Sequence, residues 1–292
     1  MIRRVVAVAA LMALAGGLAA DERPAKKAAA FGVKVVGKGR PVLLIPGLAS
    51  SGDVWDGVVA KLKDKHECHV FTLAGFAGQP AMKGPFLDAV RKEIAAYVRD
   101  KKLKKPAVIG HSLGGLMVFA LGAAEPELFG PLIAVDGVPC IPALINPKRT
   151  KDDLKKGEQI GQAMAKAKRA DFDKMLRGML GTWIDDEKVR DKVVGWGEKS
   201  DQATVARAMG ELWTRDLRKD AAAKIKSPVL LIAAAPRDGF GATADEVKER
   251  FEAQVKGVKG AKVVFAKKAK HFIMYDEPKW MFEQMETVLG KK

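Results

Sequence analysis

A serine with a glycine two positions away on either side gives the clearest sign of chemistry in the sequence. Residues 110–114 read Gly-His-Ser-Leu-Gly, follow the apolar run 106–109 and lead into a helical pattern that begins at Leu113. Such a sequence predicts a tight turn between a strand and a helix, which projects the serine hydroxyl above the edge of a sheet. The amides at the start of the helix would point toward an anion forming beside the hydroxyl. Ser112 is therefore the candidate nucleophile.

Four histidines are candidates for the general base. His111 adjoins the serine, but adjacent side chains diverge across such a turn, so we expect it to pack within the turn. His66 and His69 flank an expected strand and lack the third ligand that a zinc site would need. His271 follows the last expected strand, and the loop leaving that strand can return to the carboxyl edge of the sheet, where Ser112 is expected. His271 is therefore the candidate base.

Two carboxylates could orient that histidine. Asp238 follows the expected strand 229–233, and Asp136 follows the expected strand 132–135. Each would lie at the carboxyl end of a strand, where it could accept a hydrogen bond from the imidazole and stabilise its charged form. Asp238 gives the chain order Ser, Asp, His and lies about 33 residues before His271, the shorter and commoner arrangement. We predict Asp238 as the acid, with Asp136 as the alternative. If Asp238 is the acid, we expect Asp136 to cap the entry to an inserted segment.

Acyl transfer also requires two preorganised N–H donors for the oxyanion. The amide of Leu113 directly follows the nucleophile. The loop after the expected strand 42–45 begins Pro-Gly-Leu-Ala. Gly47 allows a sharp turn there, which would direct the amide of Leu48 toward the serine, with Ala49 as the alternative one residue later. The predicted oxyanion hole is thus formed by Leu48 and Leu113.

The elements that must position these residues follow an alternating pattern. Several of the strand-type runs are continuously apolar, as expected for strands covered by helices on both faces. The expected strands are 32–36, 42–45, 68–73, 107–109, 132–135, 229–233 and 262–265, and the expected helices between and after them are 55–64, 86–102, 113–125, 245–256 and 278–289. This alternation predicts an α/β fold with a mainly parallel central sheet flanked by helices.

One long segment interrupts the alternation. Residues 140–223 contain no strand-like run but show helical periodicity and many charges, and a structureless loop of this length is improbable in a compact protein. We expect an inserted helical cap, divided into about four helices by Gly157, Gly181, Gly195 and Gly197. The predicted organisation is a core of residues 31–138 and 224–292 and a cap of residues 139–223.

Taken together, these segments resemble the α/β-hydrolase superfamily, in its lid-bearing, esterase-like branch. The resemblance covers roughly residues 31–292 and rests on residues 46–48, 110–115, 228–238 and 271–278. It implies Ser112 as nucleophile, His271 as base and Asp238 as acid, with the amides of Leu48 and Leu113 as the oxyanion hole. It also implies a helical cap over the strandless segment, and neither a metal nor an organic cofactor.

The sequence departs from the family pattern in two places. Pro46 stands where the family usually has a histidine, which removes a side chain that normally braces the oxyanion loop. Residues 233–236, Ala-Ala-Ala-Pro, precede the predicted acid without the usual glycine and additional acidic residue.

The N-terminus predicts export. Arg3 and Arg4 precede an apolar run of about 16 residues, which is shorter than the roughly 20 residues that span a bilayer. Small residues end this run just before a charged stretch, as in a signal peptide cleaved after Ala19 or Ala20. We therefore expect residues 1–20 to be a signal peptide, with an uncleaved N-terminal membrane anchor as the alternative, and residues 21–30 to be a polar tether. The mature protein would be periplasmic or secreted, with no integral membrane span.

The charge pattern does not indicate a nucleic-acid partner. The chain has 51 Lys and Arg residues against 35 Asp and Glu residues, but the basic residues are spread out and no aromatic residues interleave with them as in nucleic-acid-binding proteins. No glycine-rich loop ends in the Gly-Lys-Ser/Thr of a phosphate site. The two cysteines, Cys68 and Cys140, could pair or remain separate buried thiols.

The predicted function is that of an exported serine hydrolase that cleaves small carboxylic esters through an acyl-enzyme. Lactone, amide or carbon–carbon bond hydrolysis on the same triad is an alternative, and a non-catalytic binding protein on this fold is another. Tryptophans and methionines in the cap could line an apolar substrate cavity or simply pack its helices; these are Trp183, Trp196, Trp213, Met164, Met175, Met179 and Met209.

Overall fold

The computed structural model describes residues 29–148, 151–238 and 241–290. The predicted signal peptide and all but the last two residues of the predicted tether lie outside these described residues. Within the described ranges, no helix is both long and apolar enough to cross a membrane.

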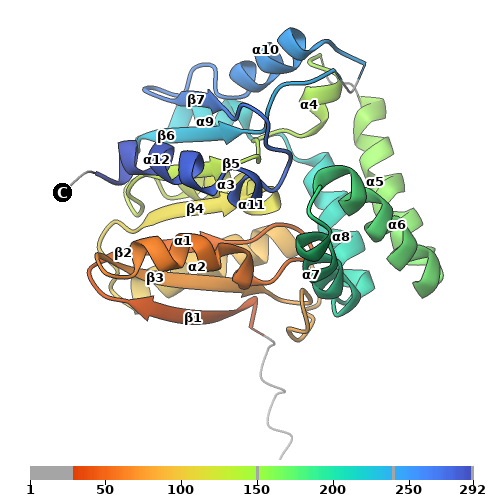
Figure 1. Cartoon of the computed structure of the whole chain (residues 1–292), viewed down its shortest axis with the longest axis horizontal. Coiled ribbons are helices and arrows are strands. Elements are labelled where there is room, and N and C mark those ends of the chain that lie inside the picture. Colours follow the sequence, from red (N-terminus) through yellow and green to blue (C-terminus); the bar gives the residue numbers. More distant parts are fainter. Residues whose placement is uncertain (1–28, 149–150, 239–240, 291–292) are drawn as a thin grey trace, which may run out of the picture.

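A seven-stranded sheet forms the centre of the molecule (Figure 1), in the order β1-β3-β2-β4-β5-β6-β7. All seven runs expected to be strands are strands, and only β1 runs antiparallel to its neighbour. The strands are β1 (Phe31–Gly37), β2 (Arg40–Ile45), β3 (His66–Leu73), β4 (Ala107–His111), β5 (Leu132–Val135), β6 (Val229–Ala233) and β7 (Lys262–Phe265). The predicted mainly parallel α/β sheet is therefore confirmed.

Two buried clusters, one on each face, explain the continuously apolar strands. In β2, Leu43 and Ile45 belong to one cluster, whereas Val42 and Leu44 belong to the other, because successive side chains of a strand point to opposite faces. The first cluster includes side chains from α2 (Phe86–Asp100), α3 (Leu113–Ala124) and α9 (Arg218–Lys224). The second includes side chains from η1 (Gly52–Trp55), α1 (Asp56–Leu62), α11 (Ile273–Asp276) and α12 (Pro278–Leu289).

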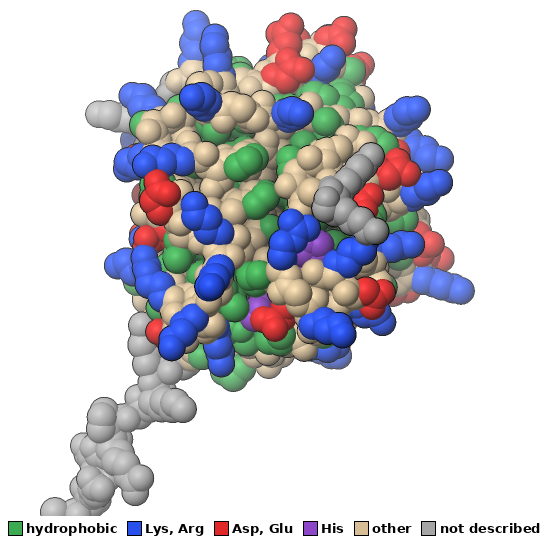
Figure 2. Space-filling model, turned by 90° about the vertical axis from the view of Figure 1, so that its left-hand side faces the viewer, with side chains coloured by type: hydrophobic (Ala, Val, Ile, Leu, Met, Phe, Trp, Pro, Cys, Tyr) green, Lys and Arg blue, Asp and Glu red, His purple; other side chains and the backbone are tan. Residues whose placement is uncertain are grey.

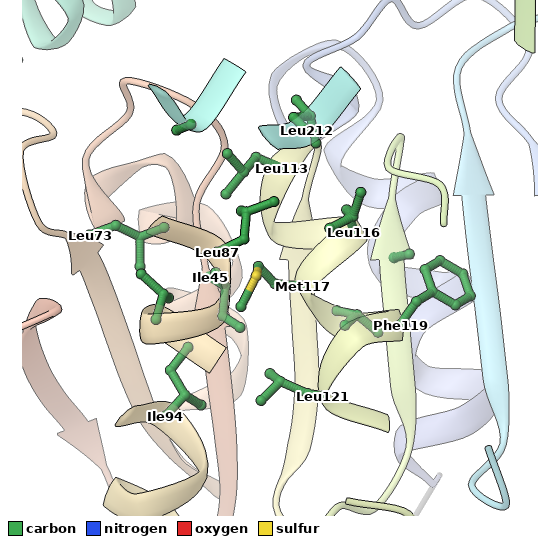
Figure 3. Packing of buried hydrophobic residues seen from close by; sticks show 14 of the residues in the cluster. Ile45, Leu73, Leu87, Ile94, Leu113, Leu116, Met117, Phe119, Leu121 and Leu212 are labelled. Atoms are coloured by element: carbon green, nitrogen blue, oxygen red, sulfur yellow. The ribbon is translucent and has the colours of Figure 1, made fainter. Parts of the chain in front are cut away.

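Helix α3 is apolar on all sides and is buried along most of its length. Figure 3 shows Leu116, Met117 and Leu121 of this helix among side chains from α2 and the strands. Glycine lets the first turn approach β2 closely, because a Cβ on Gly114 would lie 2.3 Å from the carbonyl oxygen of Ile45. The helix that follows the candidate nucleophile is thus held tightly against the sheet.

The inserted cap lies at the carboxyl ends of the parallel strands (Figure 1). Between β5 and β6 the chain forms α4 (Pro142–Ile145), α5 (Lys151–Lys166), α6 (Arg169–Trp183), α7 (Glu187–Glu198), α8 (Gln202–Thr214) and α9. Of these, α9 packs against α3 of the core. The exact boundary at residues 139–223 between cap and core stays a prediction.

The glycines expected to separate the cap helices lie inside helices, so that prediction was wrong. Gly157 is within α5, Gly181 within α6, and Gly195 and Gly197 within α7. In α5 the reason is packing: a Cβ on Gly157 would lie 2.8 Å from the Cβ of Trp213 in α8. The missing side chain there allows the two helices to cross closely, which offsets the low helix propensity of glycine.

The two cysteines are separate buried thiols, and the basic charge is spread over the surface. Cys68 and Cys140 are both buried and are not joined by a disulfide. Burial raises the pKa of the Cys68 thiol to about 11, so this thiol is protonated at neutral pH. On the face shown in Figure 2, Lys and Arg side chains are dispersed among acidic and apolar ones rather than gathered in one patch.

Candidate active site

The candidate nucleophile lies on a strained turn between β4 and α3. Ser112 has φ 54° and ψ −114°, a backbone conformation that non-glycine residues rarely adopt. Its N–H donates to the carbonyl of Val135 at 2.9 Å, which ties the turn to the adjacent strand β5. A Cβ on Gly110 would lie 2.0 Å from the carbonyl oxygen of Gly114. The glycines on either side of the serine are therefore needed for the chain to fold back this sharply.

A histidine and a carboxylate meet beside this turn. His271, in the loop after β7, donates through Nδ1 to Oδ2 of Asp136 at 2.6 Å. The second oxygen of Asp136 accepts the N–H of Ala234 at 2.8 Å, and the Asp136 N–H donates to the Ile232 carbonyl at 2.7 Å. Because the carboxylate accepts from Nδ1, a neutral His271 keeps its lone pair on Nε2, as a general base requires.

Asp136, rather than Asp238, is the partner of His271. Asp238 is exposed and accepts the N–H of Ala244 at 2.9 Å, at the start of α10 (Ala244–Gln254). It lies beyond the end of β6, where the chain has already turned toward α10. Asp136 directly follows β5, and its φ of 44° turns the chain sharply at the strand end. The prediction that Asp238 orients the histidine was therefore wrong, and the alternative holds that position.

His111 packs within the turn, as expected. Its Nε2 donates to the backbone carbonyl of His271 at 2.9 Å, and the two ring centroids are 4.6 Å apart. Complete burial holds the pKa of His111 well below its ordinary value, with the neighbouring His271 lowering it further. His111 is therefore neutral at physiological pH, and it supports the backbone of the candidate base.

The predicted oxyanion loop lies against the nucleophile. A Cβ on Gly47 would come within 3.2 Å of the Ser112 Cβ, so a larger residue would crowd this contact. The loop is held by a hydrogen bond from the Ser50 N–H to the Gly47 carbonyl at 3.3 Å. Leu113 is the first residue of α3, so its amide has no acceptor within the helix. The loop bearing Leu48 and the start of α3 therefore both adjoin Ser112.

Ser112 and His271 open onto one cavity of about 550 Å³ between core and cap. Four of the tryptophans and methionines noted in the sequence line it: Trp183, Met179, Met209 and Trp213. The others do not: Met164 and Trp196 are buried elsewhere in the cap, and Met175 is 41% exposed. The cap therefore supplies much of the apolar lining of the cavity. Some of these side chains line the cavity and others pack within the cap, so both of the uses expected from the sequence occur.

One contact at the site was not anticipated. The ring centroid of Trp183 lies 4.5 Å from that of His271, and the neighbouring Lys270 forms an ion pair with Asp185. The sequence marked Trp183 only as an apolar cap residue, because contacts between residues so far apart in the chain leave no local pattern.

Among the described residues, no group of three or more His, Cys, Asp or Glu side chains could hold a metal ion.

Comparison with known proteins gives a consistent result. The profile of the Alpha/beta hydrolase family matches residues 42–284. The pimeloyl-(acyl-carrier protein) methyl ester esterase of Nitrosomonas europaea is 26% identical over 211 residues, which cover 70% of this chain and 80% of that relative. The enzyme of the same name from Aeromonas hydrophila is 32% identical over a shorter match, covering 38% of this chain and 43% of the relative.

Solved structures share the fold at low sequence identity. A hydrolase from Pseudomonas aeruginosa superposes with a TM-score of 0.76 at 16% identity, covering 89% of this chain and 94% of the other. The enol-lactonase from Burkholderia xenovorans superposes with a TM-score of 0.70 at 18% identity, covering 89% and 96%. These similarities concern the arrangement of the chain, including the parallel sheet and its flanking helices.

Proposed function

Because the chain belongs to the alpha/beta hydrolase family, we propose that it is a serine hydrolase that cleaves small carboxylic esters through an acyl-enzyme. The observation that carries the proposal is that Ser112, on its strained turn, shares one cavity with the hydrogen-bonded pair of His271 and Asp136. Esterase-named relatives support hydrolase chemistry in general. The assignment of Ser112, His271 and Asp136 as a catalytic triad is our own.

In the proposed reaction, Ser112 Oγ attacks the ester carbonyl while His271 Nε2 accepts the hydroxyl proton. Asp136 stabilises the imidazolium that forms, and the amides of Leu48 and Leu113 stabilise the oxyanion. The imidazolium then protonates the leaving alkoxide, which departs as the alcohol. Water, deprotonated by the same nitrogen, attacks the carbonyl of the acyl-enzyme. The imidazolium then returns its proton to Ser112 Oγ as the bond from the acyl carbon to that oxygen breaks, which releases the carboxylic acid and restores the free serine.

The walls of the cavity suggest the substrate. Apolar side chains from α6, α8 and α10 face the nucleophile across a volume typical of sites for small organic molecules. We propose an ester with an apolar acyl or alkyl group, because burying such a group there removes it from water. Lactones, amides and carbon–carbon substrates belong in the same screen, since one triad can act on each of them.

The test is a p-nitrophenyl ester series assayed with wild type and Ser112→Ala. We expect the variant to lose hydrolysis by at least about 10³-fold while keeping the wild-type melting temperature. A fluorophosphonate should modify the wild type on the peptide that contains Ser112. Ser227→Ala is the matched control, since its hydroxyl donates to the Phe129 carbonyl away from the cavity. Full turnover by Ser112→Ala would sink the proposal.

We also propose export, which rests on the sequence of residues 1–20 alone. Expression of the full chain in a bacterium, followed by fractionation and N-terminal sequencing, provides the test. The expected mature N-terminus is Ala20 or Asp21, in the periplasm or the medium. A cytoplasmic protein that retains Met1 would contradict the proposal.

A further inference from the structure

Three consecutive cap residues contact the loop that carries His271. Trp183 ends α6, and its ring lies 4.5 Å from the His271 ring at an interplanar angle of 50°. Ile184 is fully buried and belongs to the same apolar cluster as Phe272 and Ile273, the two residues that follow His271. Asp185 pairs with Lys270, the residue before the histidine. Residues 183–185 and the loop that contains His271 are therefore joined by ring packing, shared apolar burial and an ion pair.

We propose that Trp183 is a positioning residue for the general base, held in place by Ile184 and Asp185. The proposal rests on the catalytic role given to His271 above. The bond from Nδ1 to Asp136 restrains the imidazole, which is also attached to the backbone through Cβ, but a single hydrogen bond still tolerates tilting of the ring plane through coupled changes in χ1 and χ2. His111 packs on the ring from the core, with centroids 4.6 Å apart, and Trp183 packs on it from the cap. The two contacts together fix the plane of the ring and so the direction of Nε2.

The three contacts are unequal. The Lys270 side chain is 23% exposed but that of Asp185 is 75% exposed, and an ion pair open to water contributes little. Ile184, by contrast, has no exposed surface, so its burial anchors this end of α6 to the core. Ile184 therefore holds the end of α6 in place, Trp183 makes the ring contact with His271, and Asp185 contributes little.

Trp183 also lines the cavity, so its two roles must be separated. A residue that is only a wall would change KM for long esters. A residue that also directs Nε2 would change the rate at which Ser112 reacts with a small reagent that does not fill the cavity. The rate constant for modification by a short-chain alkyl fluorophosphonate, measured alongside kcat and KM, distinguishes these roles.

The experiment compares Trp183→Leu, which keeps apolar bulk under the cap, with Trp183→Phe, which keeps a ring. We expect Trp183→Leu to slow both phosphonylation and kcat by about 10- to 100-fold, with a smaller change in KM, since small displacements of a catalytic group have effects of this size. Trp183→Phe should recover most of both rates. Asp185→Asn should slow them by no more than about threefold. Trp280→Ala, which removes a similarly half-buried tryptophan on α12 away from the cavity, is the control and should react at the wild-type rate.

Two results would overturn the inference. The first is Trp183→Leu phosphonylated at the wild-type rate with only KM raised, which would make Trp183 a cavity wall alone. The second is Trp183→Phe as slow as Trp183→Leu although both melt as the wild type does. Failure of the proposed function is a separate outcome, because it requires that Ser112→Ala still turns over ester.

Discussion

Backbone hydrogen bonds hold the core side of the cavity, whereas side-chain packing forms its cap side. Ser112 and Asp136 are tied through their own N–H groups to the carbonyls of Val135 and Ile232. The cap residues that face them come mainly from α6 and α8, with others from α4 and α7, and these helices reach the site through apolar contacts. The positions of the reacting groups are thus part of the sheet, while the shape of the cavity depends on helices that can repack. We expect changes on the core side to affect chemistry and changes on the cap side, apart from Trp183 beside His271, to affect substrate choice.

The largest expected effect separates the two candidate acids. Asp136→Asn should lower kcat by about 10⁴-fold, because the amide cannot stabilise the imidazolium and can favour the wrong tautomer of His271. Asp238→Asn should leave kcat within about threefold of wild type, since that carboxylate is exposed and bonds to the Ala244 N–H. Steady-state kinetics on one short ester measures both. Similar losses in the two variants would place both acids in the reaction.

A pair of glycine substitutions compares the rigidity of the two sides. Gly110→Ala should lower the free energy of unfolding by about 1–3 kcal/mol or more, because the new Cβ would lie 2.0 Å from the carbonyl oxygen of Gly114, which cannot move aside. Gly161→Ala, where the nearest atom would be 2.9 Å away in a crossing helix, should cost less, since α5 can shift and alanine favours the helix. Urea denaturation measures both. A larger loss for Gly161→Ala would mean that the cap is the more rigid side.

The pH dependence of stability should come from the core, because residues 139–223 contain no histidine. Burial holds the pKa of His111 well below its ordinary value, and the pKa values of His66 and His69 are also lowered by burial. Below about pH 6.5 the unfolded chain binds protons at these residues that the folded chain does not. Stability should therefore be greatest above that pH and fall as the pH drops, by about 1.4 kcal/mol per pH unit for His111.

His111→Gln tests this assignment by urea denaturation at pH 7.5 and 5.5. The variant should lose less stability than wild type between these two pH values, although it is less stable at both. Equal losses in the two proteins would show that His111 is not the source of the dependence.

The smallest expected effect lies on the cap side. Met209→Ala enlarges the cavity from α8 without touching the groups proposed to react. It should shift the preferred acyl chain length and change KM by a few-fold, while kcat for the shortest ester stays near wild type. A kcat loss comparable with that of Asp136→Asn would mean that the cap controls the chemistry as strongly as the core.

Local patterns in the sequence predicted the strands and the turn at Ser112, because alternation, apolar runs and glycine placement act over a few residues. Those patterns did not determine whether Asp136 or Asp238 bonds to His271. That choice depends on β5 lying beside β4 and on how far the chain travels after β6, which are properties of the assembled sheet. Chain order and spacing favoured Asp238, but proximity in the folded sheet favours Asp136.

The cap shows the same limit. Glycine is a poor helix former, and this local preference predicted breaks at Gly157 and Gly197. In the structure, Gly157 lies inside α5 at the point where α8 crosses. The crossing leaves no room for a side chain there, which explains why a glycine occupies this helical position. The contact between Trp183 and His271 likewise depends on where α6 ends above the sheet, and nothing near either residue in the chain signals it.

The three residues of the proposed triad follow β4, β5 and β7, so the last of them is synthesised only after all seven strands of the sheet. A ribosome-bound chain that has emerged only as far as β6 contains Ser112 and Asp136 but has no base. Domains generally fold as units, and β7 adds the final strand of this sheet. The proposed hydrolase therefore lacks its base until the chain beyond β7 has been made, and the appearance of ester hydrolysis would report that the last strand has been added.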